Sequence, residues 1–222
     1  YGANLLEMDV RDRHPIYTTE IECQDCYKCV RECPVKAIRI EKHHASVLPE
    51  LCTSCGRCVE VCPAQAKSIR DDTGRARLLL EGPDPVVASI APSWICEFPQ
   101  VSAGALVWAL KALGFAGASE TALGAQAVSS QIRRILRQAA SGLFLSSACP
   151  AAVEWIRKYQ PQLAGRITPI ASPLLAHCRL LRQQLGPDVK IAFFGPCIAK
   201  KLESDAHGDL LFFLLLPFVG WL

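Results

Sequence analysis

Eight cysteines between Cys23 and Pro63 are the residues whose type and spacing most directly indicate chemistry. They form two runs of the pattern C-x2-C-x2-C-x3-C-P, one ending at Pro34 and the other at Pro63. Thiolates are soft ligands, and this spacing is typical of a chain that binds two [4Fe-4S] clusters. Three closely spaced thiolates can surround one face of a cubane, whereas the longer spacer carries the fourth away from that face.

The fourth cysteine of each run is expected to ligate the cluster of the other run. On this rule one cluster is held by Cys23, Cys26, Cys29 and Cys62. The second is held by Cys52, Cys55, Cys58 and Cys33. Two other uses of these thiols stay open. Disulfides are one, although nothing in the chain is typical of secretion. Zinc is the other, although zinc sites usually contain two C-x2-C pairs without a third Cys or a trailing Cys-Pro.

The two runs are halves of an internal repeat, because every cysteine recurs 29 positions later (52 minus 23). Other residues recur at this interval too, but Lys67 stands where the repeat predicts an equivalent of Ile38. Such a repeat is expected of two pseudo-symmetric cluster-binding halves. Lys28, Arg57 and Lys67 lie near the cysteines in sequence. If they are also near in space, they offset the negative charge added on reduction.

The composition limits the class of protein. The chain has 222 residues, of which 50% are apolar, so it is globular and has room for one or two domains. A net charge of +3 is too small to indicate a nucleic-acid partner. Clusters held by thiolates need a reducing compartment, which predicts a cytoplasmic protein. The chain contains no phosphate-binding loop, no G-x-G-x-x-G after a strand and no Ser–His–Asp order, so nucleotide-binding and hydrolase functions lack support.

The sequence predicts an α+β ferredoxin-like two-cluster domain followed by an α/β domain with a mainly parallel sheet. A lead-in over residues 1–20 precedes the two-cluster domain at 21–72. Turn signals mark a linker at 73–85, and the α/β domain follows at 86–209. An apolar tail occupies 210–222.

Alternating strand and helix patterns after residue 85 predict the parallel sheet. The expected strands are 75–80, in the linker, then 86–90, 115–119, 143–148, 167–170 and 190–194. The expected helices of this domain are 101–113, 122–140, 151–159 and 173–185. Short helices are also expected around 30–33 and 59–62, at the cysteine runs.

Two further cysteines follow expected buried strands. Cys149 comes directly after 143–148, and Cys197 comes shortly after 190–194. Ligands of parallel sheets bind beyond the carboxyl ends of strands, so both thiols are candidate ligands. The alternative is a pair of buried structural cysteines. Three other residues are expected to be structural, two as buried thiols and one as a packed imidazole: Cys96, Cys178 and His177.

Two segments resemble signatures of the [FeFe]-hydrogenase large-subunit family. Ser146-Ser147-Ala148-Cys149-Pro150 is similar to the first signature, Thr-Ser-Cys-Cys-Pro, and residues 196–203 are similar to the second, Pro-Cys-x-x-Lys-x-x-Glu. Residues 88–93 and 114–124 also resemble this family, in which a two-cluster ferredoxin domain commonly precedes the catalytic domain. The resemblance covers roughly residues 20–209.

The resemblance implies that Cys149 and Cys197 ligate the cubane of the H-cluster, the family's joined [4Fe-4S] and di-iron site. It implies that Lys200 donates a hydrogen bond to a cyanide of the di-iron part, a task that suits a compact ammonium. Ala148 stands where catalytic members carry a proton-relay Cys, and an alanine cannot transfer a proton. This departure resembles a divergent branch thought to serve in sensing, whose members adjoin PAS, kinase or phosphatase modules.

The family's third signature, a C-x-x-x-C segment that supplies two more ligands, has no counterpart after Cys197. We therefore expect a truncated record, in which a third cluster or H-cluster requires a full-length parent. The tail at 210–222 is expected to come from a frame error, with a buried element or a membrane-edge segment as alternatives. Its thirteen residues are too few to span a bilayer, which takes about 20.

Three functions remain at this stage. The first is an electron-transfer protein with a hydrogenase-like domain that serves in redox or hydrogen sensing rather than fast turnover. The second is a fragment of an active hydrogenase, which forms H2 from two protons and two electrons. The third is an electron carrier whose α/β part is a degenerate docking scaffold. Each requires a redox partner protein, and none requires nucleic acid or a membrane span.

Overall fold

The computed structural model describes residues 14–139, 141–206 and 210–213. The chain folds into two compact units, residues 1–70 and 71–222. Both cysteine runs lie in the first unit, and Cys149 and Cys197 lie in the second. Within the described part of the chain, no helix has both the length and the apolar composition needed to cross a membrane.

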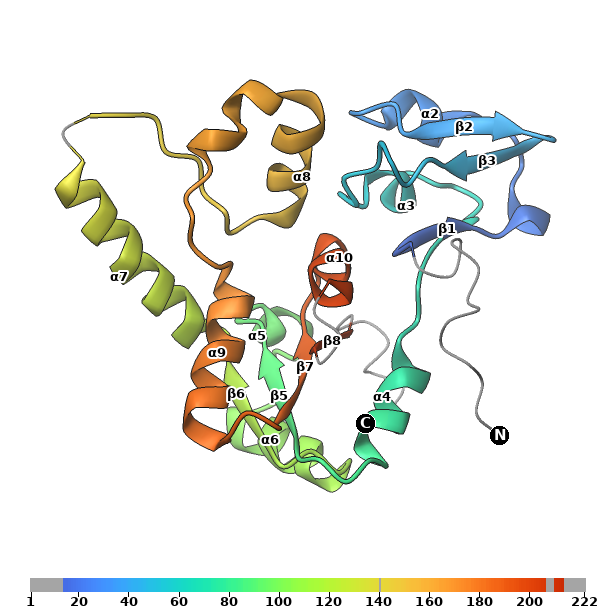
Figure 1. Ribbon diagram of the computed structural model, residues 1–222. Coiled ribbons are helices and arrows are strands. Elements are labelled where there is room, and N and C mark those ends of the chain that lie inside the picture. Colours follow the sequence, from blue (N-terminus) through green and yellow to red (C-terminus); the bar gives the residue numbers. More distant parts are fainter. Residues whose placement is uncertain (1–13, 140, 207–209, 214–222) are drawn as a thin grey trace. The chain divides into compact units, whose positions relative to one another are not determined.

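Two antiparallel strand pairs form the framework of the first unit. β1 (Ile16–Thr18) pairs with β4 (Lys67–Ile69). β2 (Ile38–Glu41) pairs with β3 (His44–Val47) as a hairpin, which Figure 1 shows. The pairing of β1 makes residues 16–18 part of this unit, although the sequence places them in a lead-in. A short 3-10 turn, η1 (Glu20–Glu22), follows β1.

The internal repeat is visible in the backbone of the first unit. The single-turn helices α2 (Lys28–Glu32) and α3 (Arg57–Glu60) begin at equivalent positions, which confirms the short helices expected at the cysteine runs. Residues with positive φ recur at the same interval, as Asp25, Tyr27 and Lys36 in the first half and Ser54, Gly56 and Gln65 in the second. This conformation is uncommon outside glycine, so both runs follow the same tight path.

The second unit contains a four-stranded parallel sheet in the order β6-β5-β7-β8. Its strands are β5 (Val86–Ile90), β6 (Gly117–Glu120), β7 (Lys190–Phe194) and β8 (Leu210–Phe213). This confirms the expected parallel sheet. β8 contains the first residues of the apolar tail, whereas residues 214–222 lie outside the described part of the chain.

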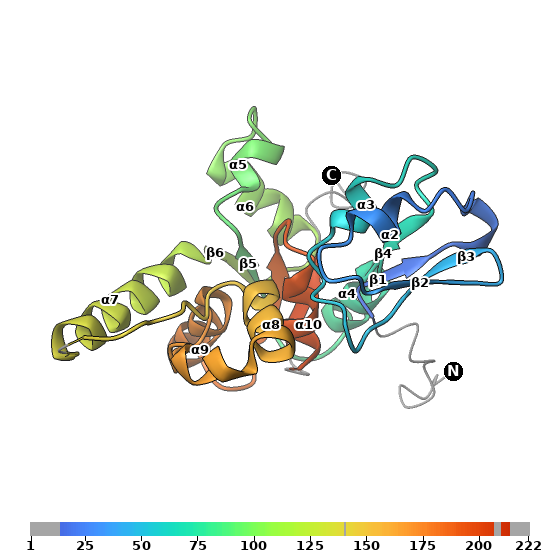
Figure 2. The ribbon, with the colours of Figure 1, turned by 90° about the horizontal axis from the view of Figure 1, so that it is seen from above.

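Helices cover both faces of this sheet, because alternate residues of its central strands are buried on opposite sides. On one side Ala88 and Ile90 join a core with α4 (Thr73–Leu80), α5 (Trp94–Glu97) and α6 (Ala103–Ala112). On the other side Val87 packs with α9 (Pro173–Leu185). Figure 2 shows α6 and α9 on opposite sides of the strands.

The remaining helices of the second unit are α7 (Ala122–Gln138), α8 (Pro150–Tyr159), η2 (Pro161–Arg166) and α10 (Ala199–Asp205). α7 packs closely on α9 at Gly124. A Cβ added there would lie 2.1 Å from the carbonyl oxygen of Pro173 and 2.7 Å from the backbone nitrogen of His177. The contact therefore requires a residue without a side chain.

Several elements have the expected type. The strands at 86–90 and 190–194 and the helix at 173–185 have the expected bounds. The strand expected at 115–119 is β6, and the other three helices differ from expectation only at their ends.

The strand expected at 75–80 is wrong, because these residues belong to α4. Ala76 is buried, and Leu79 and Leu80 pack against the same core, whereas Leu78 is exposed. This is the i, i+3, i+4 spacing of a helix face. At the start of α4, the backbone nitrogen and the hydroxyl of Thr73 donate to Asp71 Oδ1.

The buried strand expected at 143–148 is also wrong. Its only bridge among the described residues joins Leu145 to Ile167, so the strand expected at 167–170 is likewise absent from the described part. Leu143 and Phe144 are 53% and 39% exposed. The apolar composition of this segment predicted burial, but the segment has no neighbouring strand in the described part that would cover these side chains.

Candidate metal centres

A small cavity in the first unit is lined by cysteines of both runs. They are Cys23, Cys26, Cys29 and Cys62. These are the four residues that the crossed ligation pattern assigns to one cluster. Cys29 lies in α2, and Cys62 follows α3, so the fold brings together thiols that are far apart in sequence. The other walls include Thr18, Ala45 and Lys67.

A second cavity has the reciprocal lining. Its cysteines are Cys33, Cys52, Cys55 and Cys58, the set that the crossed pattern assigns to the other cluster. Three come from the second run, and Cys33 comes from the first. Its apolar walls include Ile16, Ile38 and Val47. The two cavities are therefore related by the same repeat as the sequence.

Backbone N–H groups point at sulfur in the second cavity. The backbone nitrogen of Ser54 lies 3.3 Å from Cys52 Sγ, and that of Ala37 lies 3.3 Å from Cys33 Sγ. Ser54 has a positive φ, so the tight path of the chain turns its N–H toward the thiol. Such donors stabilise negative charge on sulfur and tune the potential of a bound cluster.

Burial raises the pKa of three of these thiols. The pKa of Cys58 rises to about 12, and those of Cys29 and Cys52 rise as well, in each case chiefly because burial disfavours the charged thiolate. Iron ligation supplies the cation that a buried thiolate requires. Four thiols around a cavity, apolar walls and N–H donors to sulfur form a donor set that fits a [4Fe-4S] cluster.

Disulfides and a zinc site are the two alternative uses of the cysteines. All twelve thiols are free, so no disulfide links the runs. In the described part of the chain, no three His, Cys, Asp or Glu side chains converge as the ligands of one metal ion would.

Lys67 is the buried cation of the first cavity. It is 3% exposed, and its ammonium donates hydrogen bonds to Thr18 Oγ1 and to the carbonyl oxygen of Ala45. Burial lowers its pKa, whereas nearby thiolates, Cys29 foremost, act in the opposite direction. By contrast, Arg57 lies at the edge of the second cavity and pairs with Glu32 at 2.9 Å and Glu60 at 3.0 Å.

The two candidate ligands of the second unit lie at the ends of neighbouring elements. Cys149 precedes α8 in extended backbone, and Cys197 lies between β7 and α10. α8 and α10 are in contact. Both thiols are exposed, so the alternative of two buried structural cysteines is wrong. Cys149 does not follow a buried strand as expected, but Cys197 does follow β7.

The segment before Cys149 is fixed by a serine. Ser147 Oγ donates to the carbonyl oxygen of Ile170 at 2.7 Å, and the backbone nitrogen of Ser147 donates to Thr168 Oγ1 at 3.3 Å. Ala148 donates its backbone N–H to Ser146 Oγ at 3.2 Å. The first signature is therefore attached to residues 168–170 by side-chain hydrogen bonds rather than by a strand ladder.

Two lysines of α10 have different partners. Lys200 Nζ lies 2.6 Å from Glu203 Oε2, within the segment that resembles the second signature. Its backbone nitrogen donates to the carbonyl oxygen of Cys197 at 3.1 Å, so Cys197 and Lys200 share one turn. Lys201 Nζ lies 2.5 Å from Asp72 Oδ2 in a buried ion pair. This pair connects the start of α4 to α10.

Comparison with known proteins adds to this geometry. The family model of the iron-only hydrogenase large subunit, C-terminal domain, matches residues 84–209, more than half of the 222 residues. The chain belongs to this family. A 4Fe-4S dicluster domain model matches residues 15–76, and a search of curated proteins found no match.

This iron-only hydrogenase family member is therefore an iron–sulfur electron-transfer protein with [4Fe-4S] clusters. The dicluster match contains all eight cysteines of the two runs. The hydrogenase match contains Cys149, Cys197 and Lys200.

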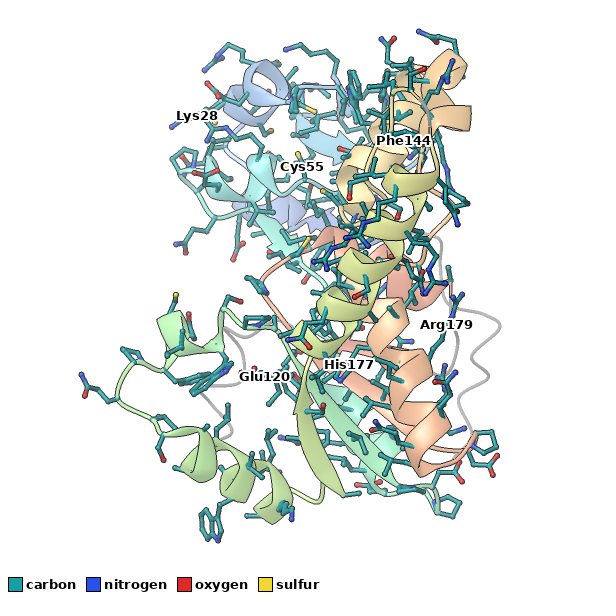
Figure 3. All side chains as sticks on the ribbon, turned by 90° about the vertical axis from the view of Figure 1, so that its left-hand side faces the viewer. Lys28, Cys55, Glu120, Phe144, His177 and Arg179 are labelled. Carbon is teal, nitrogen blue, oxygen red and sulfur yellow. The ribbon has the colours of Figure 1, made fainter. Side chains whose placement is uncertain are left out.

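Three other residues of the hydrogenase-like unit were expected to be structural. Cys178 is buried, which confirms the expectation. His177 is fully buried between two serines, with Nδ1 2.8 Å from Ser89 Oγ and Nε2 2.9 Å from Ser119 Oγ. Figure 3 labels His177 on α9, beside the strands. The expectation for Cys96 is wrong: it is exposed, because Trp94 takes the buried position of α5.

Sequence reasoning missed the partners of two site residues. Nothing local pairs Asp72 with Lys201, because 129 positions separate them. Thr168, which binds Ser147, was placed in a strand rather than beside the first signature. The burial of Lys67 had one sequence signal, the replacement of an isoleucine in the repeat, which marks an apolar position that received a charge.

Proposed function

We propose that the first unit holds two [4Fe-4S] clusters with crossed ligation, one in each cysteine-lined cavity. The observation that carries this proposal is the lining itself, because each cavity combines three thiols of one run with the fourth thiol of the other. When bound, each cluster takes up and releases one electron. The protein thus exchanges single electrons with a redox partner protein.

The residues around the thiols determine the polarity and the charge of the environment of each cluster. Ile16, Ile38 and Val47 line the second cavity with apolar atoms, which exclude water from that side. The N–H groups of Ser54 and Ala37 compensate negative charge on two sulfurs. Because charge and solvation set the reduction potential of a cluster, these residues contribute to the potentials of the two clusters.

We further propose that Cys149 and Cys197 supply two ligands of an additional cubane, of the H-cluster type. Their exposure and their place at the ends of two contacting elements support this role. Lys200 lies in the same turn as Cys197 and offers a donor for a ligand of the di-iron part. Glu203 forms an ion pair with that ammonium at 2.6 Å.

The hydrogenase-like unit is proposed to serve in redox or hydrogen sensing rather than fast turnover. The supporting observation is Ala148, which has no proton to transfer beside Cys149. Ser147, two residues before Cys149, donates its hydroxyl proton to the carbonyl oxygen of Ile170. PAS, kinase or phosphatase modules are the proposed recipients of the signal, in the cytoplasm, where thiolates stay reduced.

Hydrogen production is the second candidate, favoured by the family match over residues 84–209. Maturation with the di-iron cofactor separates the two candidates. Carbonyl and cyanide infrared bands with rapid H2 evolution favour the enzyme, whereas bands without rapid evolution favour the sensor.

Iron and acid-labile sulfide per chain test the cluster proposal, together with EPR of the dithionite-reduced protein. About eight iron atoms with signals of two interacting cubanes are expected from the first unit. About twelve would place a further cubane on this chain, and Cys149→Ser and Cys197→Ser should then each lower the count. Cys96→Ser, which removes another exposed thiol of the same unit, is the control. A count of about four or fewer would contradict the two-cluster proposal.

A further inference from the structure

The two cavities differ at several pairs of equivalent positions, and at one of them a charged side chain replaces an apolar one. Ile38 lines the second cavity and pairs with Val47 across β2 and β3. Its counterpart in the repeat, Lys67, lines the first cavity and pairs with Thr18 across β1 and β4. Both side chains are buried, at 7% and 3% exposure. At this position the first cavity has a cation and its twin has a hydrocarbon. The first cavity is also lined by the carboxylate of Asp25, which is 27% exposed and lies 3.7 Å from His43 Nδ1, whereas Lys67 is almost fully buried.

Hydrogen bonds keep the ammonium of Lys67 at the wall of the first cavity. Its ammonium donates to Thr18 Oγ1 and to the carbonyl oxygen of Ala45, and both acceptors also line the first cavity. Two oxygen acceptors suit a protonated lysine, which offers only donors. The thiols that interact with this charge are Cys29, Cys58, Cys23 and Cys62. Three of the four belong to the first cavity.

We propose that Lys67 raises the reduction potential of the cluster bound by Cys23, Cys26, Cys29 and Cys62 above that of its partner, so that this cluster is reduced first. The inference rests on the proposed two clusters and goes beyond them, because it assigns an order to two sites with the same ligands. Reduction adds one electron, supplied by an external donor, to a site that is already negative. A fixed positive charge in a poorly solvated wall favours the reduced form.

The other cation near a cluster does not cancel this asymmetry. Arg57 lines the second cavity, but its side chain is 44% exposed and pairs with two carboxylates, Glu32 and Glu60. Water and these partners screen its charge. Lys67 is buried, and its hydrogen-bond acceptors are neutral oxygens. Its effect on the nearby cluster should therefore also persist at high salt.

Redox titration monitored by EPR, with dithionite and mediators, tests the inference on the whole chain. The variants are Lys67→Met and Lys67→Ile, the second of which copies the residue of the other half. Arg57→Met is the matched control. Cys33→Ser with Cys52→Ser leaves only the first cavity with four thiols, and Cys23→Ser with Cys62→Ser leaves only the second. Combining Lys67→Met with each pair assigns the shift to one site.

The expected result is a decrease of at least about tenfold in the equilibrium constant for one-electron reduction at the first site, about 59 mV. The constant of the second site should change less. Arg57→Met should change either constant by less than about twofold. The effect of Lys67→Met should persist in 0.5 M salt. If Lys67→Met shifts the reduction potentials of both sites equally, the inference is wrong. It is also wrong if neither potential shifts while the iron content is unchanged. Failure of the unsubstituted protein to bind two clusters would instead overturn the proposed function.

Discussion

Lys201 Nζ lies 2.5 Å from Asp72 Oδ2, and both side chains are 1% exposed. Asp72 precedes α4, and its other oxygen accepts from Arg75 at 3.1 Å. Lys201 lies one residue after Lys200 in α10. The ion pair therefore holds the start of α4 against the helix that follows Cys197. Removing one member of a buried pair leaves the other charge without compensation.

Asp72→Asn should destabilise the second unit by about 3–5 kcal/mol, because it removes the negative charge of a buried ion pair. Lys201→Met should cost less, since Asp72 keeps Arg75 as a partner. Urea unfolding followed by tryptophan fluorescence measures this, because all four tryptophans lie after Asp71. Glu154→Gln, at the more exposed pair with Lys158, is the control and should cost at most about 1 kcal/mol. Equal effects of Asp72→Asn and the control would show that the buried pair contributes little.

The burial of His177 predicts a dependence of stability on pH. Burial lowers its pKa to about 4 in the folded state, below the unfolded value near 6.5. Between these values the unfolded chain binds more protons, so stability is present above about pH 6.5 and is lost as the pH falls toward 4. The loss is on the order of 3 kcal/mol. Unfolding of the second unit at several pH values should show a shallower dependence for His177→Gln. An unchanged slope would assign the acid sensitivity to other groups.

Gly124 should not tolerate a methyl group. Gly124→Ala places a Cβ against the carbonyl oxygen of Pro173 and the backbone of His177, so α7 and α9 must separate, at a cost of about 1–3 kcal/mol. Gly104→Ala is the matched control, since no atom lies within 4 Å of its added Cβ in α6. It should stabilise the helix by about 0.5–1 kcal/mol. Urea unfolding followed by tryptophan fluorescence compares both variants. Stabilisation by both would mean that the helices are not in close contact at Gly124.

The grouping of the cysteines could be predicted because each run is local and its spacing is restricted by cluster chemistry. The parallel sheet could also be predicted, since β5 and β7 are short apolar runs bounded by turns. The segment 143–148 has the same apolar character, yet Leu143 and Phe144 are exposed. Composition alone does not reveal whether a neighbouring strand exists to cover a segment.

Other features depend on contacts that sequence patterns do not encode. The pairing of Asp72 with Lys201 joins two residues that are 129 positions apart in the sequence. The exposure of Cys96 depends on which residue of a one-turn helix faces the core, and Trp94 takes that position. For residues 75–80, the helical spacing of Ala76, Leu79 and Leu80 was present in the sequence, but the flanking turn residues favoured a strand.

The iron content per chain of paired cysteine variants distinguishes crossed ligation from ligation within each run. Cys52→Ser with Cys33→Ser removes two thiols from one cavity and should leave about four iron atoms with the EPR signal of one isolated cubane. Cys52→Ser with Cys62→Ser removes one thiol from each cavity and should disturb both clusters. If the second pair instead retains one intact cubane and the first disturbs both, each run binds its own cluster and the crossed arrangement is wrong.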